Sequence, residues 1–355
     1  TAFIGRNGAG KTNILKAIEA AAKVISENNF RNISLFNEGV TLRFKFLNKI
    51  YRFTVKMEYR ENPDDALYYE ELSEELASGE SISIFSNKNE NVLIEGRNLS
   101  YPVHKSVPMA NAVLSSGMSN KHRLAIAMLV NFSSSIRYYD TSNANEFDDD
   151  ISGVVFAKDY TKWRSSIKIK NDIDHPTIFK LIHLWQSRKE VFEELLSLLG
   201  HNGLDLIDSV DIQEVKSKSK ISHYSLYFTP VGSCEDVNFV DLSFGTRRIV
   251  RLLTSMLYDK ASVALIEQPE DGIHPGLLHK IIPLLRSYAN PNQFIITSHS
   301  PDVLNMVKPE EIRMVGREDG KTVIRVLNEK EIEIAREFME NEGALSEFIE
   351  SIEER

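Results

Sequence analysis

The sequence predicts an α/β fold, and three observations support this class. At the start of the chain, the apolar residues 2–4 are typical of a strand, and a glycine-rich loop separates them from an amphipathic helix. Residues 40–46 and 51–57 alternate apolar and polar side chains on either side of a short turn, as the two strands of an antiparallel hairpin do. Residues 263–266 form an unbroken apolar run, which is typical of a strand buried on both faces.

Composition sets the outer bounds on the protein. The 355 residues are 42% hydrophobic and 26% charged, enough for one large or two ordinary domains with a core. The single cysteine, Cys234, excludes an internal disulfide and a metal site built from several cysteines. We see no signal peptide and no apolar run long enough to cross a bilayer, so we expect a cytoplasmic protein without membrane contact. Because the sequence begins without Met inside an expected strand, we also expect further residues upstream.

The net charge of −9 is unevenly distributed along the chain. Residues 329–355 contain ten acidic and three basic side chains, so the rest of the chain is close to neutral. The charge therefore neither indicates nor excludes DNA binding.

Residues 5–12 read GRNGAGKT and match the phosphate-binding pattern G-x-x-x-x-G-K-[ST] at every required position. In such a loop the glycines let backbone N–H groups point at phosphate oxygens, while Lys11 supplies charge for the β and γ phosphates. The Thr12 hydroxyl can ligate Mg²⁺, and the helix that follows places the phosphates at its N-terminus. The expected nucleotide-binding residues here are Asn7, Gly8, Ala9, Gly10, Lys11, Thr12 and Asn13.

Three further stretches follow in an order that a known family shares. Residues 242–246 read LSFGT, residues 263–270 read VALIEQPE, and residues 294–301 read FIITSHSP. With the phosphate loop, they resemble the signature motif, the Walker B strand and the switch-histidine strand of ABC ATPases. Their spelling is similar to the RecF, SMC and OLD branch, not to membrane transporters, and the compact head resembles ATPases of bacterial anti-phage systems. The resemblance covers roughly residues 1–60 and 235–316.

This resemblance implies an ABC ATPase head with a mainly parallel core sheet, an antiparallel β subdomain and a helical insertion, using ATP and Mg²⁺. We expect the head to be formed by residues 1–99 and 221–328, which are separated by a mainly helical insertion at 100–220 and followed by acidic helices at 329–355. Within the insertion, residues 177–199 carry the clearest helical periodicity and are predicted to form an amphipathic helix. Outside it, residues 81–85 and 91–95 resemble a pair of strands, and residues 312–316 and 322–327 predict a hairpin around the turn 318–320.

The same resemblance assigns roles to residues that follow the apolar run 263–266. Glu267 is expected to hold Mg²⁺, directly or through water, opposite Thr12. Gln268 stands where the family has a glutamate that polarises the attacking water, and an amide can orient water but cannot take its proton. We therefore expect weak hydrolysis, either from a naturally slow ATPase or from a trapping substitution, and we favour the substitution. The expected catalytic residues are Lys11, Gln268 and His299, with Thr12 and Glu267 as metal ligands.

Two of these positions have simpler alternatives. A lone histidine is usually structural, but the setting of His299 after an apolar strand favours a contact with the γ-phosphate. Glu270 is a rival for the catalytic base, or it holds the turn before Gly272.

Ser243 and Gly245 begin a predicted helix, whose first N–H groups form a second anion site or, in a simpler interpretation, an ordinary helix cap. The resemblance implies a homodimer in which two heads enclose two ATP molecules and each signature motif caps the γ-phosphate of the partner, alone or within a larger assembly. No glutamine lies between the phosphate loop and Gln186, which is placed in mid-helix, so the family's Q-loop residue cannot be assigned.

Three polar segments remain open to more than one interpretation. Glu146 with residues 148–150 forms either a metal site or, as we favour, a solvated loop. The alternating lysines of residues 216–220 predict an exposed hairpin turn, with contact to a phosphate backbone as the alternative. Residues 329–355 carry two apolar stripes at helical spacing, one for the core and a second that could face a partner.

Taken together, the sequence predicts an ATP-gated dimeric switch that controls a partner in anti-phage defence. No nuclease or protease motif follows the last strand, so a nuclease-type effector is expected on a separate protein. The alternatives are a RecF-like DNA-repair or chromosome-associated ATPase that binds DNA, and a scaffold that binds ATP without hydrolysing it.

Overall fold

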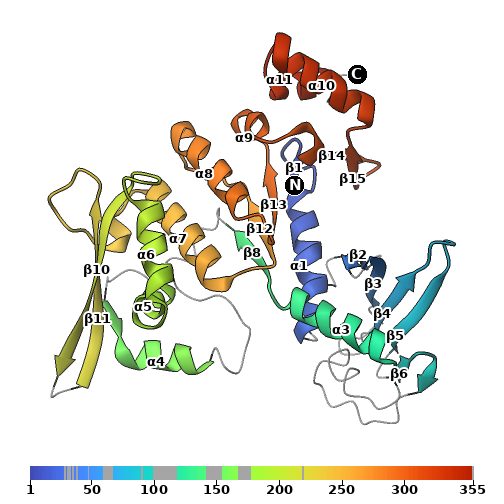
Figure 1. The fold of residues 1–355 in the computed structure, drawn as a ribbon, viewed down its shortest axis with the longest axis horizontal. Coiled ribbons are helices and arrows are strands. Elements are labelled where there is room, and N and C mark those ends of the chain that lie inside the picture. Colours follow the sequence, from blue (N-terminus) through green and yellow to red (C-terminus); the bar gives the residue numbers. More distant parts are fainter. Residues whose placement is uncertain are drawn as a thin grey trace. The chain divides into compact units, whose positions relative to one another are not determined.

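The computed structural model describes residues 1–27, 29, 33, 36, 39–46, 48–58, 67–88, 91–98, 118–140, 154–166, 177–217 and 220–353. The predictions for Glu146 and residues 148–150, and for the middle of the turn at 216–220, lie outside these residues. The chain forms two compact units (Figure 1). The first contains Thr1–Lys11 and Tyr139–Arg355, and the second contains Thr12–Tyr138.

The central sheet of the first unit has the strand order β15-β14-β1-β13-β12-β8. Strand β1 runs parallel to both β13 and β14, and β12 runs parallel to β13, while β15 closes one edge as the antiparallel partner of β14. Every residue of β12 is buried, as its unbroken apolar run predicted. The mixed α/β class with a mainly parallel core sheet is therefore confirmed. The bounds are β1 (Ala2–Ile4), β8 (Ile136–Asp140), β12 (Val263–Glu267), β13 (Gln293–Ser298), β14 (Ile312–Glu318) and β15 (Lys321–Val326).

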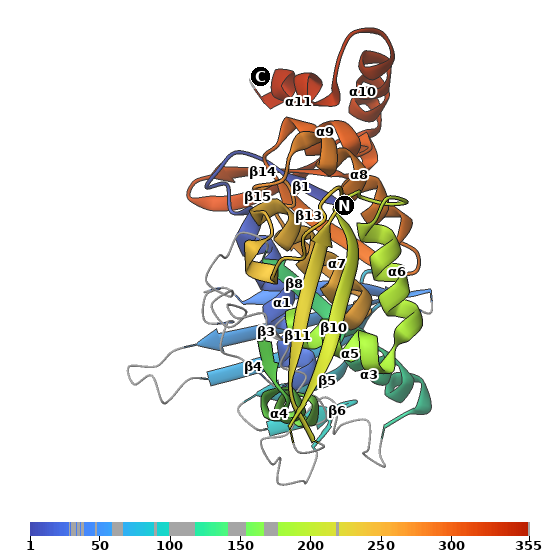
Figure 2. The same cartoon turned by 90° about the vertical axis from the view of Figure 1, so that its left-hand side faces the viewer.

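Helices and a second small sheet complete the first unit around one hydrophobic core. Helix α8 connects β12 to β13, and α9 follows β13 directly (Figure 1). Figure 2 shows the long strands β10 and β11 side by side, and β9 pairs with the other side of β11. The bounds are α4 (Ala157–Ser166), α5 (Thr177–Ser187), α6 (Lys189–Leu199), α7 (Phe244–Asp259), α8 (Pro275–Ser287), α9 (Pro301–Met306), α10 (Glu329–Asn341), α11 (Leu345–Glu353), β9 (Val154–Phe156), β10 (Ile207–Ser217), β11 (Lys220–Pro230), η4 (Phe239–Asp241) and η5 (Pro309–Glu311).

The predicted helix over residues 177–199 is two helices, α5 and α6, which meet at Arg188. This residue leaves the helical region with φ −141° and ψ 60°. Its guanidinium donates hydrogen bonds to the carbonyl oxygens of Tyr258 and Leu257 at 2.9 and 3.1 Å, in the last turn of α7. A cation at the C-terminal carbonyls of a helix is stabilising. The apolar periodicity continues across the break because both α5 and α6 pack against α7.

The second unit combines α1 (Lys11–Glu27, apart from its first residue) and α3 (Asn120–Ser133) with a six-stranded antiparallel sheet around its own core. The predicted hairpin is the pair β2–β3, and the predicted pair of strands over residues 81–85 and 91–95 is β5–β6. Strand β4, rich in glutamate, lies between these pairs and was not foreseen. The bounds are β2 (Val40–Phe46), β3 (Lys49–Glu58), β4 (Leu67–Glu75), β5 (Ser81–Lys88), β6 (Asn91–Ile94) and β7 (Arg97–Asn98).

The C-terminal part of the chain follows the sequence prediction closely. The expected hairpin is β14–β15, and the acidic segment forms α10 and α11, of which α11 packs against α9 and α10. None of the helices in the described ranges combines the length and the apolar character that crossing a membrane requires.

Candidate nucleotide-binding site

The site is built where three neighbouring parallel strands end. Ile4 of β1 lies opposite Ser298 of β13, and Glu267 of β12 lies opposite Thr297 of β13. Because adjacent strands lie about 4.8 Å apart, the residues that follow them leave the same sheet edge close together. The phosphate loop, His299 and Gln268 are therefore positioned by strand register, which agrees with the rule that ligands of open α/β sheets bind at the carboxyl ends of the strands.

The phosphate loop turns between β1 and α1, with the Ala9 N–H donating to the Arg6 carbonyl at 3.2 Å. Lys11 begins α1 and is only 6% exposed. Its ammonium group donates to the carbonyl oxygens of Gly5 at 2.6 Å and Arg6 at 3.0 Å. These two bonds hold a buried cation inside the loop, where it can serve as the counter-charge of a phosphate.

Glu267 ends β12 with its side chain 7% exposed, and the chain turns sharply after it. Gln268 adopts the left-handed conformation with φ 43°, and its N–H donates to the Thr297 carbonyl at 2.9 Å. A left-handed conformation is costly for a residue other than glycine, and such residues gather at functional sites. The turn directs the Gln268 side chain toward β13, out of the line of β12.

Gln268 and His299 are in direct contact, since the amide nitrogen of Gln268 lies 2.9 Å from Nδ1 of His299. When this amide donates, Nδ1 is the acceptor and the ring proton resides on Nε2, which can then donate to an anion.

Glu270 completes the cluster. Its Oε1 accepts from the Ser298 hydroxyl at 2.6 Å and from the His299 N–H at 3.2 Å, and lies 3.6 Å from His299 Nδ1. Glu270 thus holds the end of β13. The simpler alternative from sequence, in which Glu270 holds the turn before Gly272, did not include this contact.

Arg248 is a site residue that the sequence reasoning missed. It lies on α7, five residues after Ser243, and is 4% exposed. Its guanidinium donates to the carbonyl oxygen of Gln268 at 2.9 Å and to that of Asp271. Burial lowers the pKa of the Arg248 guanidinium. Helix α7 is therefore joined to the turn after β12, and the available signal was the second arginine directly after LSFGT.

Ser243 is the N-cap of α7, and its hydroxyl accepts from the Thr246 N–H at 3.2 Å. The helix cap considered from sequence is therefore present. Ser243 itself is exposed, so the first turn of α7, with Gly245, is open to a ligand from outside. Gln186, expected in mid-helix, instead lies in the last turn of α5 and is engaged elsewhere, because its amide bonds the hydroxyl groups of Tyr160 and Tyr224.

The residues present fit Mg²⁺ by the chemistry of their donors, because a carboxylate oxygen and a hydroxyl are hard ligands of the kind that this ion prefers. Glu267 supplies the first from the sheet edge. Thr12 follows Lys11 in the first turn of α1 but is counted with the second unit, as is Asn13, so their places relative to Glu267 stay predictions. Within the described ranges no three His, Cys, Asp or Glu side chains form a metal-binding cluster.

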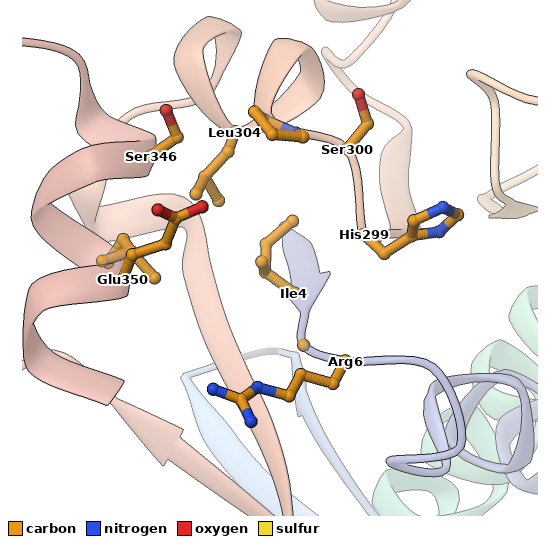
Figure 3. Close-up of a pocket in the computed structure, with 10 residues that line it drawn as sticks. Ile4, Arg6, His299, Ser300, Leu304, Ser346 and Glu350 are labelled. Atoms are coloured by element: carbon orange, nitrogen blue, oxygen red, sulfur yellow. The ribbon is translucent and has the colours of Figure 1, made fainter. Parts of the chain in front are cut away.

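A pocket of about 270 Å³ adjoins the phosphate loop and His299 (Figure 3). Ile4, Arg6 and His299 line it from the central sheet edge, and Leu304 lines it from α9. Ser346 and Glu350 of α11 close its far side. The C-terminal acidic segment therefore reaches the region beside His299.

Known proteins resemble this chain in sequence and in fold. The chain is similar to a protein named "Retron Vc95 probable ATPase" from Vibrio cholerae serotype O1 biovar El Tor, with 21% identity over 90% of this chain and 69% of that protein. Among solved structures, it is similar to an SmcHead bound to the C-winged helix domain of ScpA (TM-score 0.46, 14% identity, 94% of this chain and 91% of that one). It is also similar to the SMC head domain from Thermotoga maritima (TM-score 0.39, 14% identity, 92% and 89%).

A mainly parallel core sheet that carries at one edge a phosphate loop and the residues expected as Walker B carboxylate and switch histidine, Glu267 and His299, is typical of an ATPase of the ABC/AAA type. The family model described as "AAA domain, putative AbiEii toxin, Type IV TA system" matches residues 1–305. Because this match covers most of the chain, the protein belongs to that family, AAA_21. Membership implies a nucleotide substrate and, as is usual for such ATPases, Mg²⁺.

Proposed function

We propose that the chain binds and hydrolyses ATP as a nucleotide-gated dimeric switch that controls a separate effector protein. One observation carries this proposal. The phosphate loop, the Gln268–His299 pair and Glu267 leave three adjacent parallel strands in matching register, so the loop, an amide, an imidazole and a carboxylate share one sheet edge.

In this proposal the phosphate-loop N–H groups and Lys11 bind the β and γ phosphates, and Glu267 with Thr12 holds the ion. Bound Mg²⁺ supplies positive charge to the β and γ phosphates. His299 donates from Nε2 to the γ-phosphate, while the Gln268 amide orients the attacking water without accepting its proton. Hydrolysis is consequently slow, whether Gln268 is natural to the chain or a substitution that traps the bound state.

The dimeric part of the proposal rests on α7. This helix of sixteen residues presents its capped N-terminus, Ser243 to Gly245, at an exposed position, and N-terminal N–H groups attract anions. A second head can therefore offer the same helix end to the γ-phosphate of the first, with ATP enclosed between them. Arg248 then ties closure to the turn that carries Gln268.

The biological setting is supported by the likeness of the motifs to anti-phage ATPases. The family description, which names a toxin of a Type IV TA system, and the relative named after a retron point the same way. We propose that the effector is a nuclease-type protein, and co-purification identifies it most directly. Retention of DNA on the same preparation distinguishes the RecF-like alternative, through its strong dependence on salt.

The proposal is tested with two variants. Lys11→Ala removes the counter-charge and should abolish ATP binding, measured by calorimetry, while far-ultraviolet circular dichroism stays unchanged. Ser243→Arg places a long cation in the capped interface, so it should leave ATP binding intact but block closure. The scattering mass with ATP should then be that of a monomer, and the turnover should fall to the rate of a single head. Thr246→Ser, one turn further along α7, is the control.

Undiminished ATP affinity in Lys11→Ala would refute the site. Unchanged mass and unchanged turnover in Ser243→Arg would refute the shared interface while leaving the nucleotide site in place. Turnover is read with mass because a dimer held by other surfaces would keep its mass without closing over ATP.

A further inference from the structure

The hairpin β14–β15 touches the phosphate loop at two points, although more than 300 residues separate them in sequence. At the first point, Gly5 lies so close to β14 that a Cβ atom on it would be 2.1 Å from the Val315 carbonyl oxygen. At the second, the Thr322 hydroxyl of β15 donates a hydrogen bond to the Ala9 carbonyl at 3.0 Å. The hairpin is therefore part of the support of the loop.

The second contact is unusually specific for an exposed strand. Every residue of β15 is exposed, so Thr322 is not held there by burial in a core. Its hydroxyl would lie 2.0 Å from a Cβ atom on Gly10, whose φ is +100°. Gly10 therefore needs to be glycine both for its conformation and for the approach of Thr322.

The contact has a defined effect on the loop because the peptide unit is planar. The carbonyl of Ala9 and the N–H of Gly10 belong to one trans peptide, so they point in opposite directions. A hydroxyl that holds the Ala9 carbonyl outward therefore fixes the Gly10 N–H inward. Inward-pointing N–H groups are what binds phosphate in such a loop.

We propose that Thr322 is a positioning residue of the nucleotide site, which sets the orientation of the Ala9–Gly10 peptide for phosphate binding. This inference rests on the proposed binding of ATP by the loop. The N–H that it orients contacts phosphate both before and during hydrolysis. Loss of the hydroxyl therefore weakens binding of substrate and transition state together, which raises KM and leaves kcat unchanged.

The test compares Thr322→Val, which keeps the shape and removes the hydroxyl, with Thr322→Ser, which keeps the hydroxyl. ATP should bind roughly 3- to 10-fold more weakly to Thr322→Val, the change expected from one lost hydrogen bond. KM should rise by the same factor with kcat within about twofold, and Thr322→Ser should restore both. Thr161→Val is the matched control, because the Thr161 hydroxyl likewise donates to an alanine carbonyl, that of Ala157 at 2.7 Å on α4.

Wild-type affinity in Thr322→Val would overturn the inference, and so would a Thr322→Ser variant as weak as Thr322→Val. A fall in kcat at constant KM would also overturn it, since that pattern reports a smaller folded fraction. Lys11→Ala is measured alongside. If it still binds ATP, the proposed function fails, whereas loss of binding in Lys11→Ala with full binding in Thr322→Val refutes the Thr322 role alone.

Discussion

At the scale of single residues, Gln268 is unusual in three ways at once. It has a left-handed backbone, its N–H bonds across to β13, and its amide contacts His299. Both the backbone and the side chain of Gln268 are held in place. Replacing its amide with another group therefore changes its interaction with His299 as well as with water.

Gln268→Glu should therefore raise hydrolysis by at least ~10², because general-base catalysis is typically worth ~10²–10⁴ in rate. The ATP-bound dimer should also become shorter-lived, since closure is then followed by cleavage. Single-turnover kinetics measure the first effect. Light scattering after mixing with ATP measures the second, through the lifetime of the dimer.

Glu270→Gln is the companion to this experiment. Because Glu270 holds the Ser298 hydroxyl and the His299 N–H, its loss should lower the rate modestly, by about tenfold or less. No gain in Gln268→Glu together with a collapse in Glu270→Gln would instead assign the catalytic base to Glu270.

Glu70 in β4 is a second residue of interest, because it should affect the stability of the fold although it belongs to none of the motifs. It is 1% exposed, accepts from the Asn87 amide at 3.0 Å, and its Oε2 has no hydrogen-bond partner among the described residues. Burial raises the pKa of the Glu70 carboxyl from 4.5 to about 7, against the opposing effect of the Asn87 bond. The folded chain therefore keeps a proton in this range that the unfolded chain has released.

Stability should consequently fall as pH rises from about 4.5 to about 7, by an amount on the order of 3 kcal/mol. Glu70→Gln should remove most of this dependence, matching the wild type at pH 4.5 and exceeding its melting temperature at pH 8. The exposed Glu80→Gln serves as the control. Parallel melting curves of wild type and Glu70→Gln between pH 4.5 and 8 would contradict the assignment.

At the scale of elements, Arg248 connects α7, which begins in the proposed signature motif, to the turn after β12. Arg248→Lys keeps the charge but loses the planar fork that reaches both the Gln268 and Asp271 carbonyls. We expect kcat to fall by roughly tenfold, since a bond from a charged donor is worth about 1.5–3 kcal/mol, while ATP affinity stays within about twofold. Single-turnover assays in the Gln268→Glu background give the required sensitivity.

The adjacent Arg247→Lys is the control on the same helix. An unchanged kcat in Arg248→Lys would mean that the turn after β12 keeps its geometry without the arginine, and that α7 affects hydrolysis by another route.

The elements also indicate how far sequence reasoning reaches. The strand–loop–helix at the phosphate loop, the buried β12 and the hairpins β2–β3 and β14–β15 were predicted because periodicity and turn residues are local properties. The break at Arg188 was not, since its cause is a bond to the end of α7, far away in sequence. Strand β4 was missed because its buried glutamates hide the alternation of apolar side chains.

The same distinction applies to the site. Lys11, Glu267, Gln268 and His299 were selected from motifs, and their alignment at one sheet edge follows from strand register. Arg248 and Thr322 belong to no phosphate or metal motif. Their roles come from contacts with backbone carbonyls, which a sequence does not display.

At the scale of the whole molecule, the two units have separate hydrophobic cores and are joined through α1 and β8. The first unit contains both ends of the chain, whereas the second is a continuous stretch within it. The motif-bearing strands therefore belong to a single unit.

The position of β1 in the middle of its sheet has a consequence for synthesis of the protein. Ala2 pairs with Ile296 on one side and with Ile312 on the other, so both neighbours of β1 are translated long after β1 itself. Contacts so distant in sequence form late and slowly. The phosphate loop is thus translated well before the strands that support it, and the proposed ATP site is complete only in a chain whose translation has passed β14.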